Sequence, residues 1–113
     1  MTIDSQKLLL ACVDKIKEKK GMDIVSLKLK DITLICDYFI ILTAGSARQS
    51  RAIADFLYEE LKAEYRFPRL EGYQEGRWLL MDYGAVVIHI MLAEERQYYN
   101  LEKLWADAPA ESY

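Results

Sequence analysis

The segment that most constrains the fold is WLLMDYGAVVIHIML, residues 78–92. Apolar residues dominate both of its halves, and Gly84 stands between them, which predicts two strands joined by a tight turn. Side chains alternate between the two faces of a strand, so each half divides into two sets. Pairing the halves about Gly84 brings the uniformly apolar sets together and predicts one core face. That face consists of Leu79, Met81, Val86, Ile88 and Ile90.

The opposite face of this predicted hairpin carries a mixed set of side chains, namely Trp78, Leu80, Asp82, Val87, His89 and Met91. Protein interfaces are enriched in Trp and Met around scattered polar groups, so this set favours a partner-binding surface. The alternative is a second buried face beneath a helix. A register slip of one residue would exchange the two faces, so the assignment depends on the position of the turn.

The first part of the chain predicts one helix and two strands. Residues 5–19 place apolar side chains at helical spacing, with Ser5 as the expected N-cap and Gly21 just beyond the end. Residues 23–32 alternate between apolar and polar, which predicts a half-buried strand. Residues 37–43, DYFIILT, are mostly apolar, as is typical of a strand at the centre of a sheet.

The rest of the chain adds a second helix and a short third one. Residues 46–65 predict a helix that begins with a capping box formed by Ser46 and Gln49. Residues 66–77 contain one proline and two glycines and predict a loop. Residues 94–109 predict a short helix that ends before Pro109, with one side formed by Leu101, Leu104 and Trp105. The order α-β-β-α-β-β-α predicts a single α+β domain over residues 1–113, with a mixed sheet packed by helices.

Composition limits the classes of function. The net charge of −3 disfavours a protein whose affinity comes from nucleic-acid phosphates, and a basic protein partner suits it better. The longest apolar run has five residues, too short for a membrane span, and the N-terminus lacks the basic start of a signal peptide. We therefore expect a cytoplasmic protein. Cys12 and Cys36 have no Cys or His nearby, which predicts buried free thiols.

A Gly-Ser pair at residues 45–46 stands where a strand hands over to a helix, as in enzymes that transfer nucleotides and hold a phosphate there. Such enzymes also need two neighbouring carboxylates to hold two metal ions. Asp55 lies within the predicted helix, and Asp82 has no acidic residue two positions away on either side. A single carboxylate cannot hold the metal pair, so we predict no catalytic residue, metal or cofactor.

Other polar residues give weaker signals. His89 is the only histidine and could pair with Asp82 across the hairpin, with Ser46 nearby, but a lone histidine within a strand is more often structural or interfacial. Arg48 and Arg51 flank the start of the second helix, where cations are disfavoured. This hints at an anion or a partner in contact with Ser46, Arg48 and Arg51. Solvated surface arginines are the alternative.

Three blocks of the sequence carry a family resemblance. They are DITLICDYFIILTAGSARQSRAIADFL, EGYQEGRWLLMDYGAVVIHIM and ERQYYNLEKLWADAP. In their order and spacing they resemble the ribosomal silencing factor family, also called the Iojap family, most strongly over residues 31–109. Ala85 departs from the pattern, because the family usually has Asp after D-Y-G.

The resemblance implies a function. Family members bind the large ribosomal subunit through its fourteenth protein, block joining of the small subunit and repress translation when nutrients are scarce, without acting as enzymes. Their fold is similar to that of nucleotidyltransferases without the catalytic carboxylates. A degenerate nucleotide-binding protein of that kind is the alternative function.

The resemblance also suggests where partners bind. It places the ribosomal contact at Trp78, Leu80, Asp82, His89 and Met91, supported by Tyr98 and Tyr99. Family members are often dimeric, and the sequence leaves open whether a homodimer would use the same surface. Direct RNA contact is not expected to dominate, and no membrane association is expected.

Overall fold

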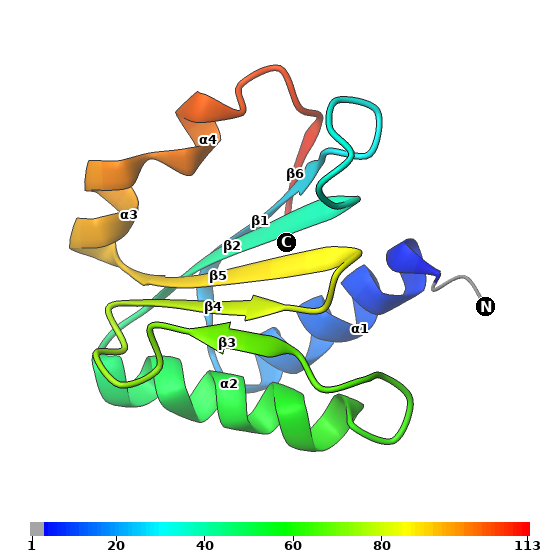
Figure 1. Cartoon of the computed structure of the whole chain (residues 1–113). Coiled ribbons are helices and arrows are strands. Elements are labelled where there is room, and N and C mark those ends of the chain that lie inside the picture. The colour runs from blue at the N-terminus through cyan, green and yellow to red at the C-terminus, as the bar shows by residue number, and fades with distance from the viewer. Residues whose placement is uncertain (1–3) are drawn as a thin grey trace.

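One six-stranded sheet forms the centre of the computed structural model, which describes residues 4–113 (Figure 1). Its strands are β1 (Met22–Lys28), β2 (Tyr38–Ala44), β3 (Arg69–Glu71), β4 (Trp78–Asp82), β5 (Val86–Leu92) and β6 (Ala110–Ser112). Their spatial order is β3-β4-β5-β2-β1-β6. β2 and β5 run parallel and every other neighbouring pair is antiparallel. The predicted α+β class with a mixed sheet is therefore confirmed.

The four helices are divided between the two sides of the sheet (Figure 1). The long helices α1 (Ser5–Glu18) and α2 (Ala47–Leu61) cover one side, and the short helices α3 (Ala93–Tyr99) and α4 (Leu101–Leu104) lie on the other. The main core fills the space between the long helices and the sheet. Its helix residues include Leu8, Cys12, Ile16, Ile53 and Leu57, and its sheet residues include Ile40, Leu42 and Ile88.

The hairpin of β4 and β5 has the predicted turn and register. Leu80 pairs with His89 and Asp82 with Val87, so the five predicted core residues share one face and are fully buried. Gly84 has φ +87°, a value that favours glycine, and its N–H donates to Asp82 Oδ1 at 2.7 Å. The turn residue and the alternation of apolar side chains therefore fix which face becomes the core.

The two long helices begin with side-chain caps. Asp4, and not the predicted Ser5, caps α1, because its Oδ1 accepts a hydrogen bond from the Lys7 N–H at 3.1 Å. The cap of α2 is Ser46, as predicted, with its Oγ accepting from the Gln49 N–H at 3.1 Å. The Gln49 Oε1 accepts from the Gly45 N–H at 2.6 Å, one residue earlier than in the usual capping box.

Two predictions about irregular segments are wrong. Residues 66–77 contain β3, which pairs with β4, although they were predicted as a loop. Residues 94–109 form two helices in place of the single predicted one, because Asn100 adopts φ +44°, ends α3 and caps α4, and β6 follows them. Leu101 and Trp105 pack on the sheet, but Leu104 is 72% exposed, so the predicted common side of these residues is not formed.

Both cysteines are buried free thiols, as predicted. Burial raises the pKa of Cys12 to about 12 and, together with the charge of Asp82, the pKa of Cys36 to about 11. Both thiols therefore stay protonated and unreactive at neutral pH. Across residues 4–113, the helices are too short or too polar to cross a membrane.

Candidate functional site

The sheet face turned away from α1 and α2 carries a second, smaller apolar cluster, which we call the second face. Its buried residues are Leu27, Leu29, Cys36, Ile41, Val87, Met91 and Ala108, and its partly buried residues are Val25, Phe39, Trp78, Leu80, Leu101 and Trp105. Neither α3 nor α4 contributes a buried residue to its cover. This face is therefore thinly covered, and apolar side chains reach its surface.

A row of aromatic rings connects α3 to the second face. The ring centroids of Tyr98 and Tyr99 are 5.0 Å apart, and those of Tyr99 and Trp78 are 4.7 Å apart. The row continues from Trp78 to His89 at 6.0 Å and from His89 to Phe39 at 4.5 Å. Rings at these spacings pack favourably on one another. Because Tyr98 is 80% exposed and Tyr99 50% exposed, the row runs from solvent into the sheet.

His89 is held as a neutral ring. Its Nδ1 accepts a hydrogen bond from the Trp78 Nε1–H at 3.1 Å, so the ring proton is on Nε2. Burial lowers the pKa of His89 to about 4, although the negative charge of Asp82 acts in the opposite direction. The Nε2 atom is buried and has no hydrogen-bond partner. His89 therefore fixes the Trp78 indole and is uncharged at neutral pH.

The pairing of His89 with Asp82 that the sequence suggested is not formed. The Asp82 carboxylate instead accepts from the Gly84 N–H and lies 3.4 Å from the Arg69 guanidinium. Asp82 is at the rim of the second face, with 27% of its side chain exposed. It is therefore placed to meet a charged group outside the protein, and a hydrogen-bonded Asp–His pair is absent.

The structure brings the residues predicted for partner binding to one surface, at different depths. Trp78, Leu80 and Asp82 are half-buried on the second face, with Tyr98 and Tyr99 exposed beside them. Met91 is fully buried and His89 is 4% exposed. In this arrangement these two residues support the surface from below, and the other five are accessible.

Arg96 holds α3 against the sheet and was missed by sequence reasoning. Its Nη1 donates to the Asp23 carbonyl at 2.7 Å and to the Thr43 hydroxyl at 2.9 Å. Its Nε and Nη2 donate to the two carboxylate oxygens of Glu102, each at 3.2 Å. Such a two-pronged pair fixes both position and orientation. Arg96 thus ties α3 to the ends of β1 and β2 and to α4. In the sequence, the neighbouring segment Y-Y-N-L-E pointed to this region, but Arg96 itself was not singled out.

Gly72 packs directly against the backbone of Trp78, and sequence reasoning did not single it out as a site residue. Its φ is +74°, and a Cβ added there would lie 2.1 Å from the Trp78 carbonyl oxygen. Any larger residue would force the start of β4 to move. Phe39 was also missed, because the continuous apolar pattern of β2 does not distinguish its two faces.

The residues suspected of anion contact lie far from Asp82. Ser46 follows the end of β2, whereas Asp82 pairs with Val87 beside Phe39 at the start of β2. At about 3.3 Å per residue, Phe39 and Ala44 are roughly 17 Å apart along the strand, and Ser46 also begins a helix on the opposite side of the sheet. A phosphate-holding junction and this carboxylate therefore do not form one site.

The arginines near this junction have different surroundings. Arg51 donates from Nη1 to the Gln74 carbonyl at 2.9 Å and so docks the turn before β4, while Arg48 is exposed. In the described range, 4–113, no three His, Cys, Asp or Glu side chains gather where they could hold a metal ion. The junction caps α2 through Ser46 and docks the turn through Arg51, and the contact of Ser46, Arg48 and Arg51 with an anion or a partner stays a prediction.

Comparisons with known proteins agree with one another. The family model described as "Ribosomal silencing factor during starvation" matches residues 2–113. A Halalkalibacterium halodurans protein named "Ribosomal silencing factor RsfS" is 44% identical over 108 residues, which are 95% of this chain and 92% of that protein. A crystal structure of a Chromobacterium violaceum protein superposes with a TM-score of 0.87 at 33% identity and covers 92% of this chain and 88% of that one.

A more distant relative has a name that refers to the ribosome. The mouse protein named "Mitochondrial assembly of ribosomal large subunit protein 1" is 34% identical over 97 residues, 82% of this chain and 42% of that protein. The match of the family model extends over almost the whole chain, and the similar fold and sequences accompany it. On this evidence the chain is a member of the ribosomal silencing factor family.

Proposed function

We propose that this protein silences ribosomes by binding the large subunit through its fourteenth protein, where it sterically blocks joining of the small subunit and represses translation under nutrient limitation. Membership of the family supports this function. The observation that carries the binding site is the row of aromatic rings on the second face, with Trp78 at its centre. No other surface of the described residues combines a fixed indole with exposed tyrosines.

Trp78 has the properties of an anchor for a protein partner. Its Nε1–H is already bonded to His89, and its ring packs on Tyr99, so the side chain is held in place before a partner arrives. A preorganised side chain loses little conformational entropy on binding. Tryptophan and tyrosine are also enriched among the residues that dominate binding energy. Trp78 and the exposed rings of Tyr98 and Tyr99 therefore form the centre of the proposed contact.

Charge at the rim of the second face supports a basic partner. Arg69 is shared between Asp82 at 3.4 Å and Glu71 at 3.1 Å. Arg69 and Glu71 are largely solvent-exposed, and Asp82 is 27% exposed. Exposed ion pairs of this kind contribute little to folding, so a basic group on a partner can replace Arg69 at small cost. The net charge of −3 also favours association with a basic surface.

The proposed mechanism depends on occupancy and requires no turnover. A protein seated on the surface that the small subunit must occupy prevents joining for as long as it stays bound. A Kd of about 1 μM corresponds to roughly −8 kcal/mol. An interface of about 1,200–2,000 Å² centred on a tryptophan is of a size that can supply it. The same surface can also pair two copies of the chain, and we propose that a homodimer would compete with the ribosome.

The test is sedimentation with isolated ribosomal subunits. The unmodified protein should co-sediment with large subunits and lower the yield of joined ribosomes. Trp78→Ala combined with Asp82→Ala should abolish both effects while the far-UV circular dichroism stays unchanged. Phe67→Ala with Glu64→Ala is the matched control, because it removes an exposed aromatic ring and an acidic group after α2.

The outcomes separate the two parts of the proposal. If the unmodified protein neither sediments with large subunits nor affects joining, the proposed function is wrong. If it does both and the double variant of Trp78 and Asp82 behaves like the control, the function stands and the second face is not the contact surface.

A further inference from the structure

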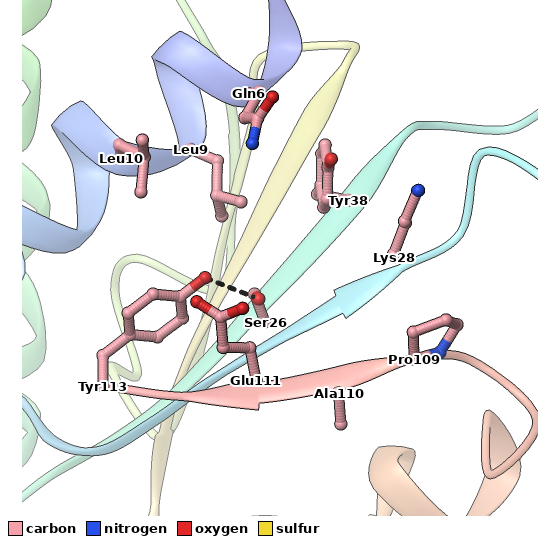
Figure 2. A pocket seen from close by; sticks show the side chains of 10 residues that line it. All are labelled: Gln6, Leu9, Leu10, Ser26, Lys28, Tyr38, Pro109, Ala110, Glu111 and Tyr113. Carbon is pink, nitrogen blue, oxygen red and sulfur yellow. Dashed lines mark hydrogen bonds between the residues drawn. The ribbon is translucent and has the colours of Figure 1, made fainter.

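A cleft opens on the side of the sheet opposite the second face, between α1, the edge strand β6 and its neighbour β1 (Figure 2). The cleft exists because α1 packs over β2 and β5, and the sheet extends beyond β2 by β1 and β6, which α1 does not cover. The cavity has a volume of about 240 Å³. This is smaller than the roughly 300–1,000 Å³ of sites for drug-sized ligands, so it suits a ligand of amino-acid size.

The floor of the cleft has a buried polar pair. Ser26 is 4% exposed and lies on the side of β1 that faces α1. Its hydroxyl is 2.9 Å from the Tyr113 hydroxyl, and Figure 2 shows this bond at the base of the cleft. Burial and the Glu111 carboxylate, with which the Tyr113 hydroxyl also interacts, raise the pKa of Tyr113, so the O–H donors are engaged and oxygen lone pairs remain available to a donor such as an ammonium. A ligand in the cleft would therefore meet fixed hydrogen-bonding groups.

Two opposite charges line the same side of the sheet edge. Ser26 pairs with Glu111 across the two strands, and the Lys28 N–H bonds to the Pro109 carbonyl. Lys28 and Glu111 are therefore diagonal neighbours, with backbones roughly 7–8 Å apart. The Lys28 ammonium is 3.9 Å from Asp31, at the limit of an ion pair between exposed groups. Such a pair contributes little, so a ligand carboxylate can replace Asp31.

The wall formed by α1 consists of the apolar Leu9 and Leu10 and the polar Gln6 (Figure 2). Leu9 is almost fully buried, but Leu10 is 49% exposed although it lines the cleft. An aliphatic side chain placed against Leu10 and the Tyr38 ring would remove apolar surface from water. A nucleotide fits this site poorly, because Lys28 is the one cation among the lining residues and the Glu111 carboxylate would repel a phosphate.

From this combination we propose that the cleft binds a small zwitterion with an apolar side chain, of the class of free aliphatic α-amino acids. The ligand ammonium lies against Glu111 and the Ser26–Tyr113 hydroxyl pair, and its carboxylate against Lys28. Its side chain packs on Leu10. Since the cleft and the second face lie on opposite sides of the sheet, this proposal does not depend on ribosome binding.

The test is titration of the full chain with L-leucine, followed by the ¹H–¹⁵N NMR spectrum. We expect saturable shifts confined to α1, β1 and β6 by about 10 mM ligand, which corresponds to a weak small-molecule site. N-acetyl-leucine lacks the ammonium and leucinamide lacks the carboxylate. Each should bind at least about tenfold more weakly, the factor that 1.4 kcal/mol of lost interaction produces.

Matched variants locate the site. Glu111→Gln and Lys28→Met should each weaken leucine binding by about tenfold, a typical loss for one charged contact. Glu64→Gln and Lys30→Met remove one acidic and one basic group outside the lining and should bind like the unmodified protein. The proposal is overturned if leucine gives no saturable shifts, or if neither cleft variant changes them. It is also overturned if leucinamide or a leucine-initiated peptide binds as tightly as leucine, because the site would then recognise a peptide N-terminus.

Discussion

On the side covered by α1 and α2, the sheet residues Ile40, Leu42 and Ile88 have no exposed surface, whereas on the second face Phe39, Trp78 and Leu80 are only partly buried. Both sets belong to one sheet, and on β2 the alternate residues Phe39 and Ile40 point to opposite faces. The difference comes from the cover, because two long helices pack on the first side and two short helices without buried residues lie on the other. One side thus stabilises the fold, and the other keeps apolar surface available.

The largest expected effect comes from removing side chains from the two faces in parallel. Ile88→Ala on the covered side should lower the free energy of unfolding by about 2–5 kcal/mol, because a closely packed core cannot fill the cavity. Leu80→Ala on the second face should cost about 1 kcal/mol, because the side chain is already partly in water. Urea denaturation measures both values. Equal losses would show that the second face contributes as much to stability as the main core.

A pH titration sharpens the contrast through His89. Its pKa is about 4 in the folded protein and about 6.5 when unfolded, so the unfolded chain binds the proton first as pH falls. Stability present above pH 6.5 should therefore decrease between pH 6.5 and 4, by about 3 kcal/mol from this group. His89→Gln should remove this part of the pH dependence when the free energy of unfolding is measured by urea denaturation at each pH. An unchanged slope in that variant would assign the loss to other groups.

Arg96 tests whether the thin cover depends on polar contacts. Arg96→Lys keeps the charge but cannot form the two-pronged pair with Glu102, so we expect a loss of about 2 kcal/mol, in the range for hydrogen bonds to charged groups. Amide hydrogen exchange should accelerate in α3 and α4, and large-subunit binding should weaken as Tyr98 and Tyr99 lose their support.

Arg77→Lys is the control for Arg96, because Arg77 pairs with Glu94 and Glu95 near the same helix but is half-exposed. Exposed pairs contribute at most about 1 kcal/mol, so this variant should change exchange and binding little. If the two lysine variants behave alike, the position of α3 depends on apolar packing, and Arg96 is not the residue that holds it.

The sequence predicted the parts of the fold in which a periodic pattern meets a clear turn signal. The hairpin follows from strict alternation about Gly84, and α2 from its Ser46 cap and apolar stripe. β3 and β6 have only three exposed residues each, too few to form a pattern. The break between α3 and α4 depends on the left-handed conformation of the single residue Asn100, which no periodic pattern marks. The cap of α1 was assigned to Ser5 because the sequence does not distinguish it from Asp4, an equally good capping residue one position earlier.

The sequence predicted which side chains share the second face, but not how deeply each one is buried. Alternation places Trp78, Leu80 and His89 on one face, and the structure agrees. His89, which bonds to Trp78, is covered by Phe39 from β2, a strand distant in sequence. Long-range contacts of this kind leave no periodic signal, so Arg96 and the support from Gly72 were also missed.

The smallest effect separates stability from recognition on the covered side. Ser46→Ala removes the cap of α2 and should cost about 1 kcal/mol of stability. Because Ser46 and Arg48 lie at the start of α2, on the side away from the second face, neither Ser46→Ala nor Arg48→Ala should change large-subunit binding at a temperature where both variants stay folded. If Arg48→Ala binds large subunits more weakly than the unmodified protein, and the difference grows at low salt, the start of α2 contacts RNA phosphates. Such contacts strengthen as the salt concentration falls. The contrast between a stabilising side and a recognition side would then no longer hold.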